Sequence, residues 1–390
     1  MHENSRPRAL DGLGCLLTIT AVVWLLGSAA AAGQSTAPNE DPYPQTGPLS
    51  GYMDFHFNKP EAADGVLDFH RFVLLVSHSF SERIRFVGEL ELEHAVVEGL
   101  EEAGELELEQ AYVDFLLAPS FNVRAGMLLV PVGIINERHE PPVYYGVERP
   151  FVDTVIVPTT WFDVGVGAHG EVGRGIRYRA YVMAPLNAAE FSAEDGIRAG
   201  RQKGSEANAG RVAYTGRVEF VGIDGLTLGG SVWQGRSGFA FRPRFDVGVG
   251  VVEADARYAR GALELRGQYA HVFVDHAGAL NDALGRQVGV DPNVAREMRG
   301  FYLESGYRVL VRPDIGEVGV FGRYENFDTQ YRMPVGYQPL RQFDRTAWVV
   351  GATYWPDPDV AVKFDYSIVG NQSAVVKARN SVNVGLGWWF

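Results

Sequence analysis

Runs of about ten residues with alternating apolar and polar side chains recur along this sequence. In the stretch 83–93, "RIRFVGELELE", Ile84, Phe86 and Leu90 alternate with charged residues. Successive side chains of a β-strand point to opposite faces, so such a run has one apolar and one polar face. Repeated runs of this length are typical of membrane-crossing β-barrel strands, whose apolar face meets lipid and whose polar face meets water.

The alternation predicts sixteen strands, an even number. They are expected at 50–58, 66–79, 83–95, 105–117, 121–130, 161–171, 176–185, 210–221, 226–235, 246–258, 262–274, 296–309, 317–326, 344–355, 360–369 and 379–390. Short turns follow every second strand and longer loops lie between them, as in bacterial outer-membrane barrels. The phase of the alternation changes near Gln110, where we expect a β-bulge. The predicted fold class is therefore all-β, a transmembrane antiparallel β-barrel over residues 50–390.

The sequence ends within such a run, "SVNVGLGWWF" at 381–390, with Val382, Val384, Leu386, Trp388 and Phe390 on one parity. A closed barrel pairs its last strand with its first, so we expect this run to be a strand whose even-numbered residues face outer-membrane lipid. We interpret the terminal Phe390 as an assembly signal for the barrel-assembly machinery.

The first residues have the features of an export signal. Arg6 and Arg8 precede an apolar run at 13–26, and the small residues Ala30 and Ala32 follow it. This order predicts a signal peptide at 1–32, with an uncleaved anchor as the alternative. Residues 33–49, rich in Pro and Ser, are expected to be a periplasmic linker. Cys15 is the sole cysteine and lies in the signal, so the mature chain has no disulfide.

Charge and motifs narrow the function classes. The formal charge is −13, which gives no basic patch for nucleic acid. "GVGAHG" at 165–170 fits a dinucleotide fingerprint but no helical pattern follows it, so we expect a strand. "NERHEPP" brings Glu137, His139 and Glu140 together without metal-ligand spacing, and we expect a solvated loop there. No G-x-S-x-G motif occurs. The sequence predicts neither enzyme, metal nor cofactor.

The segment 131–160 is the longest predicted loop and the third long one. Loops of this length without their own structure are usually functional, and four prolines stiffen this one. We expect it to fold into the barrel and narrow the pore, with an ordinary surface loop as the alternative. Its candidate constriction residues are Glu137, Arg138, His139, Glu140, Tyr144, Tyr145, Glu148 and Arg149.

Three segments, "FHRFVLLVSHSFSERIRFVGELELEHA", "GELELEQAYVDF" and "RAGMLLVPVGIINERHEPPVYYGVERPFVDTVIVPTTW", resemble the phosphate-selective porin O and P family. The resemblance implies a sixteen-stranded outer-membrane porin, commonly a homotrimer, for passive diffusion of small hydrophilic solutes or inorganic anions such as phosphate. The family's pore has an arginine ladder, for which Arg83, Arg85, Arg124, Arg177 and Arg179 are the candidates here. Its lysine cluster has no counterpart, since the chain has only four lysines.

Glutamates are expected in the same pore wall. Glu89, Glu91 and Glu93 share one parity, where like charges repel one another and need water. We therefore expect them to line a hydrated lumen and not to act as paired catalytic carboxylates. The competing interpretation of the whole chain is a secreted all-β binding or hydrolytic protein, either a sandwich or a propeller.

Overall fold

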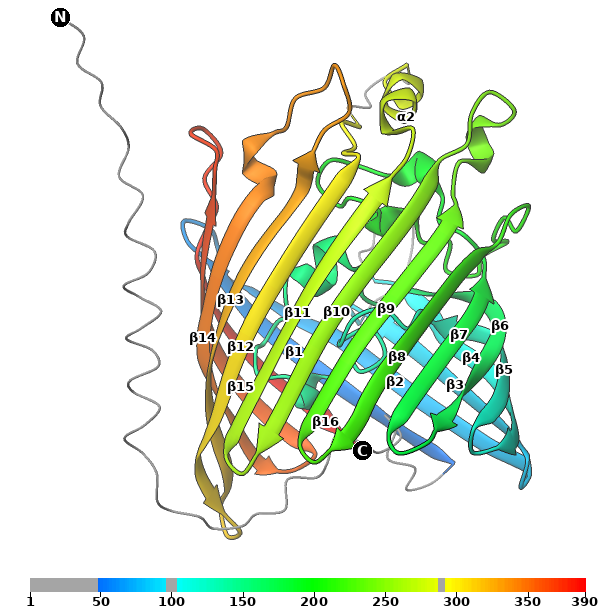
Figure 1. Cartoon of the computed structure of the whole chain (residues 1–390). Coiled ribbons are helices and arrows are strands. Elements are labelled where there is room, and N and C mark those ends of the chain that lie inside the picture. Colours follow the sequence, from blue (N-terminus) through cyan, green and yellow to red (C-terminus); the bar gives the residue numbers. More distant parts are fainter. Residues whose placement is uncertain (1–47, 96–103, 287–291) are drawn as a thin grey trace, which may run out of the picture. The chain divides into compact units, whose positions relative to one another are not determined.

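The structure, a computed structural model, describes residues 48–95, 104–286 and 292–390. The predicted signal peptide at 1–32 and residues 33–47 of the predicted linker lie outside the described residues. Sixteen strands form one closed antiparallel barrel in which each strand pairs with its neighbours in sequence and β16 pairs with β1 (Figure 1). The predicted sixteen-stranded barrel is confirmed, and a closed barrel excludes the sandwich and propeller alternatives.

The strands are β1 Leu49–Pro60, β2 Val66–Ser81, β3 Ile84–Glu93, β4 Leu106–Ala118, β5 Phe121–Leu129, β6 Phe162–Val172, β7 Ile176–Met183, β8 Ala213–Ile223, β9 Leu226–Arg236, β10 Gly248–Arg260, β11 Leu263–Val274, β12 Glu297–Arg312, β13 Gly316–Arg332, β14 Asp344–Asp357, β15 Val360–Asn371 and β16 Ser381–Trp389. The loops carry the short helices η1 Pro141–Val143, η2 Val152–Ile156, η3 Ala188–Glu190, η4 Arg198–Gly200, η5 Phe239–Phe241, α2 Ala277–Leu284 and η6 Arg341–Phe343. Among the described residues, no helix has the length and apolar character needed to cross a membrane.

Most strand ends lie within three residues of the predicted positions, and β13 is the exception. It was expected to end at 326 but continues to Arg332, because its residues still pair with β12 as far as the pair Glu297 and Arg332. The predicted bulge is confirmed: the register of β3 and β4 shifts so that Glu109 has no partner of its own. As a result, Glu109 and Gln110 are both buried although they are adjacent in the strand.

The last strand closes the barrel. Leu386 pairs with Phe55 of β1 and with Val362 of β15. The amide of Gly51 donates to the carbonyl of Phe390, and the amide of Phe390 donates to the carbonyl of Gly51. In β16 the odd-numbered residues Asn383, Gly385 and Gly387 are buried, whereas Val382 and Val384 are exposed. The two parities therefore lie on opposite faces of the wall, as the alternation predicts.

The largest apolar cluster joins the wall to several loops, among them the segments 130–161 and 184–212. Trp161 packs against Trp233 of β9 with ring centroids 5.3 Å apart, and Leu186 and Ile197 belong to the same buried cluster. Arg201 donates to the carbonyls of Thr159 and Thr160 at 2.7 Å, which satisfies loop carbonyls that have no strand partner. The two loops thus stabilise each other.

Candidate functional site

The two ends of the long loop, which we call loop 131–160, are held together by one side chain. The amide nitrogen of Asn136 donates to the carbonyls of Val130 and Trp161, both at 2.8 Å. The amide of Trp161 donates back to Oδ1 of Asn136 at 2.8 Å. These three bonds close the neck of the loop where β5 ends and β6 begins.

Beyond the neck, the loop backbone binds buried polar side chains of β13, β14 and β15. The amide of Val152 donates to Glu325 at 3.0 Å and that of Val147 to Asp365 at 2.7 Å. Lys363 donates to the carbonyls of Tyr144 and Gly146 at 2.7 and 2.8 Å. A buried charge is costly unless it is hydrogen-bonded, and the loop supplies these bonds.

The same loop also meets strands β1, β4 and β7. Glu148 Oε1 lies 3.0 Å from Nδ1 of His56 in β1. Nε2 of His139 lies 3.2 Å from Glu109 in β4, and Glu137 forms an ion pair with Arg179 in β7 at 3.1 Å. Figure 1 shows the short helices of this region among the strands of the barrel. Loop 131–160 therefore contacts residues from strands spread around the wall.

The eight candidate constriction residues differ in how far their side chains are buried. His139, Glu140, Tyr144, Tyr145 and Arg149 are buried, whereas Glu137 and Arg138 are partly exposed and Glu148 is half-covered. The expected solvated loop is therefore wrong for His139 and Glu140. Their side chains are covered because this part of the loop lies against β3 and β4.

Tyr145 is held by aromatic rings and by close glycines. Its ring stacks on Phe321 at 5.6 Å and meets the edge of Trp355 at 5.5 Å. A Cβ on Gly319 would lie 2.8 Å from the same ring. The glycine thus allows the tyrosine to lie flat against the wall.

Glu89, Glu91 and Glu93 lie on one face of β3, as predicted, but the expected hydrated setting is wrong for the first two. Glu89 and Glu91 are each 1% exposed. Arg71 of β2 lies 3.7 Å from Glu91 and 3.9 Å from Glu93, while Gln110 donates to Glu89 at 2.5 Å. A neighbouring cation and a neighbouring amide offset part of the repulsion between these carboxylates.

Two of the candidate ladder arginines converge on one carboxylate. Asp114 of β4 lies 3.3 Å from Arg85, 2.7 Å from Arg124 and 3.2 Å from His169. The Asp114 side chain is fully covered, whereas those of Arg85 and Arg124 are 23% and 19% exposed. The exposed part of this cluster therefore belongs to the arginine side chains and not to the carboxylate.

The other candidate arginines lie elsewhere. Arg179 lies between Glu137 and Glu219, and Glu219 also binds Arg217 and Arg257. Arg177 pairs with Glu171 close to the β6–β7 turn, and Arg83 is exposed in the β2–β3 turn. The five candidates thus form no single continuous row.

Phe390, the predicted assembly signal, stacks on Phe72 with ring centroids 6.3 Å apart.

Sequence reasoning missed several charged residues of the inner wall, namely Arg71, Arg266, Arg323 and Lys363. Arg266 lies 2.8 Å from Glu304, and Arg323 is ion-paired with Glu304 and Glu325. Arg266, Arg323 and Lys363 lie on the charged parity of their strands, so the alternation could have identified them. Arg71 shares its parity in β2 with Phe69, Val73 and Leu75, so the alternation gave no signal for it.

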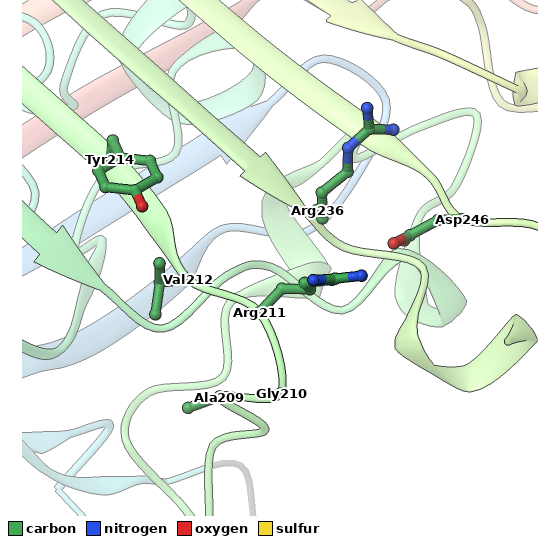
Figure 2. A pocket seen from close by; sticks show the side chains of 7 residues that line it. All are labelled: Ala209, Gly210, Arg211, Val212, Tyr214, Arg236 and Asp246. Carbon is green, nitrogen blue, oxygen red and sulfur yellow. The ribbon is translucent and has the colours of Figure 1, made fainter.

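A shallow pocket lies at the loop ends of β8 and β9 (Figure 2). Its lining residues are Ala209, Gly210, Arg211, Val212, Tyr214, Arg236 and Asp246. Tyr214 is 61% exposed and belongs to the outward parity of β8. This pocket therefore lies outside the inner wall and includes none of the predicted site residues.

Solved structures with a similar fold include bacterial outer-membrane proteins, among them a porin. A Salmonella typhi OmpF complex matches with a TM-score of 0.59 at 13% identity, covering 88% of this chain and 97% of OmpF. An anion-selective porin from Comamonas acidovorans matches with a TM-score of 0.54 at 15% identity, covering 88% and 98%. The trimer form of OmpT from Vibrio cholerae gives 0.55 at 11% identity, covering 88% and 98%. The chain thus has the fold of outer-membrane porins.

No family model matches the sequence. A protein of Aquifex aeolicus strain VF5, described only as uncharacterized, is 36% identical over 334 residues, which cover 82% of this chain and 74% of that protein. Identity of this extent shows common descent along most of both chains. This chain belongs to the same protein family as the Aquifex aeolicus protein.

Proposed function

We propose that this protein is a porin of the bacterial outer membrane through which small hydrophilic solutes or ions diffuse passively. A closed barrel with an apolar outer face and a charged inner face supports this function, because such a barrel offers lipid and water the surfaces that each requires. The likeness to porins agrees with it. No catalytic step or cofactor is part of the proposal.

The assembly is proposed on the same basis. Export by the signal peptide at 1–32 and folding by the barrel-assembly machinery, with Phe390 as its signal, deliver the barrel to the membrane. We take a homotrimer as its state, since one of the similar solved outer-membrane proteins is a trimer form.

Loop 131–160 is the proposed constriction of the pore. Its contacts with Asp365 of β15 and with Arg179 of β7 come from strands that lie eight positions apart in the closed sixteen-stranded barrel. A loop anchored to separate parts of the wall crosses the lumen between its anchors. The free cross-section for solutes is thereby reduced.

The proposed selectivity is a weak preference for anions, and the exposure of the paired charges carries it. In the Asp114 cluster the carboxylate is covered while the side chains of Arg85 and Arg124 are partly exposed. Asp255 is likewise covered while its partner Arg257 is 18% exposed. A permeating ion would thus meet guanidinium groups, which bind phosphate-like oxygens bidentately.

The reversal potential in a salt gradient across a planar bilayer tests this proposal. The double variant Arg85→Gln with Arg124→Gln is expected to lose most of the anion preference while still forming conducting channels. Arg236→Gln, on the outer face, is the matched control and should leave the reversal potential unchanged. A cation-selective wild type, or equal potentials in all three proteins, would overturn the selectivity. A folded barrel that never conducts would overturn the porin itself.

A further inference from the structure

Three histidines lie in a row on the inner side of β1, β2 and the segment after β3. The ring centroids of His56 and His70 are 4.7 Å apart, and those of His70 and His94 are 5.7 Å apart. Asp54 lies two residues before His56 on the same face of β1 and is 1% exposed. Imidazoles and a carboxylate gathered in this way are the ligand types of zinc-like ions.

We propose that Asp54, His56 and His70 form a binding site for a divalent transition metal ion of the zinc class. Oδ2 of Asp54 lies 2.5 Å from Nε2 of His56 and 3.6 Å from Nδ1 of His70. The three side chains each offer one ligand atom, and these atoms lie within 4.8 Å of one another. Three protein ligands leave a fourth position for water, as in open zinc sites.

The far nitrogen of His56 supports this role. Its Nδ1 lies 3.0 Å from Oε1 of Glu148, and Glu148 in turn accepts from Nδ2 of Asn58 at 2.9 Å. In a neutral His56 that donates its Nδ1 proton to Glu148, the Nε2 lone pair faces the Asp54 carboxylate. These two acceptors need either a proton on Nε2 or a metal cation between them. Metal-ligating histidines have just such a carboxylate on their other nitrogen.

Arg71 defines which oxygen of Asp54 is available. Its Nε lies 3.3 Å from Oδ1 of Asp54, whereas Oδ2 faces the two histidines. Nη2 of Arg71 also lies 3.3 Å from Nε2 of His70. Because arginine only donates, this contact places the His70 proton on Nδ1, and metal binding through Nδ1 requires the contact to break.

The surroundings favour a cation that arrives through the lumen. Asp68 lies 2.8 Å from His94, and Glu93 and Glu148 interact with His70 and His56. The cations that face Asp54 are Arg71 and, further away, Lys363. The His70 side chain is 22% exposed, so one ligand is accessible to solvent. A fixed excess of negative charge raises the local concentration of cations.

A second cluster of suitable residues is less favourable. Nε2 of His139 lies 3.2 Å from Glu109 and 3.9 Å from Glu89, and all three side chains are at most 1% exposed. This cluster has one imidazole instead of two, and nothing in it meets solvent. It therefore serves as the competing site in the test.

Calorimetric titration of the folded, chelator-treated protein in detergent with Zn²⁺ tests the proposal without reference to channel activity. We expect saturable binding by the wild type and affinity weakened about 10- to 100-fold or more in His56→Gln and in His70→Gln. His139→Gln, in the competing cluster, and His276→Gln, an exposed histidine beside Asp275, should bind like the wild type.

Heat-modifiable migration on a denaturing gel identifies the variants that have folded. If His56→Gln misfolds, the test of the site rests on His70→Gln, because the His70 side chain is less buried than that of His56. Absence of Zn²⁺ binding by the wild type would overturn the site. So would loss of binding in His139→Gln while His70→Gln retains it.

Discussion

Asp114 shows how a single buried carboxylate controls the charge presented to the lumen. It neutralises part of the positive charge of Arg85 and Arg124 while remaining covered itself. Asp114→Asn is therefore expected to strengthen the anion preference, because the partly exposed side chains of Arg85 and Arg124 lose their counter-charge. The same change should lower the free energy of unfolding by about 1–3 kcal/mol, since polar partners are left unpaired.

The reversal potential and the urea midpoint of Asp114→Asn in lipid vesicles measure both effects. Asp314→Asn is the control, because Asp314 pairs with Arg312 in the exposed β12–β13 turn. A reversal potential in Asp114→Asn that equals that of the control would show that this cluster does not face the permeating ions.

The sequence could predict which residues share a face but not which are covered. Parity alone places Glu89, Glu91 and Glu93 together on β3. Arg71, Gln110 and loop 131–160 cover Glu89 and Glu91, and no local sequence pattern predicts these contacts.

The proposed metal ligands did have a local signal in the sequence, the repeated "DFH" at 54–56 and 68–70. Pairing of β1 with β2 places His56 opposite Asp68 and brings the two repeats together.

At the scale of the element, the last strand tests the assignment of the lipid face. Leu386 lies near the middle of β16 on the outward parity. Leu386→Arg is expected to cost about 2–4 kcal/mol near the bilayer midplane, and Leu386→Ala much less. Folding yield in lipid vesicles measures the difference. Equal yields of the two variants would contradict an outward Leu386. Gly387 makes a poor inward control, because a Cβ there would lie 2.5 Å from Pro141.

The loop that we propose as the constriction can be shortened. Removal of residues 138–147 takes away the part that contacts Lys363 and the aromatic rings around Tyr145. A larger single-channel conductance is expected, because the lumen between the anchors is opened. Removal of 335–339 from the exposed β13–β14 loop is the control. Conductance that stays at the wild-type value in the first variant would make loop 131–160 a surface feature.

Asp153 makes the anchoring of the same loop sensitive to pH. Burial raises the pKa of its carboxyl to about 7, although a hydrogen bond from Gln268 at 2.6 Å opposes the shift. The folded state thus holds a proton that the unfolded chain releases near pH 4. Stability from this group is therefore fully present below about pH 4 and is lost as the pH rises to about 7.

Urea midpoints between pH 4 and 8 test this dependence. Asp153→Asn is expected to flatten the decline, since its amide stays neutral throughout. A wild-type profile that matches the variant at every pH would show that Asp153 does not titrate in this range.

At the scale of the whole molecule, strand number and connectivity could be predicted because alternation is local and each strand pairs with the next in sequence. The end of β13 was misplaced because pairing with β12, and not its own alternation, extends it to Arg332. The course of the long loop was harder to predict in detail. Its anchors include pairs such as Val152 with Glu325, 173 residues apart, and no local pattern reports such contacts.

The central claim, a water-filled barrel for passive diffusion, is tested most directly by swelling of liposomes that contain the folded protein. With neutral sugars of increasing size, we predict swelling rates that fall steadily with solute size and exceed those of protein-free liposomes for the smallest sugars. Swelling no faster than in protein-free liposomes, from protein that migrates as a folded barrel, would contradict the claim.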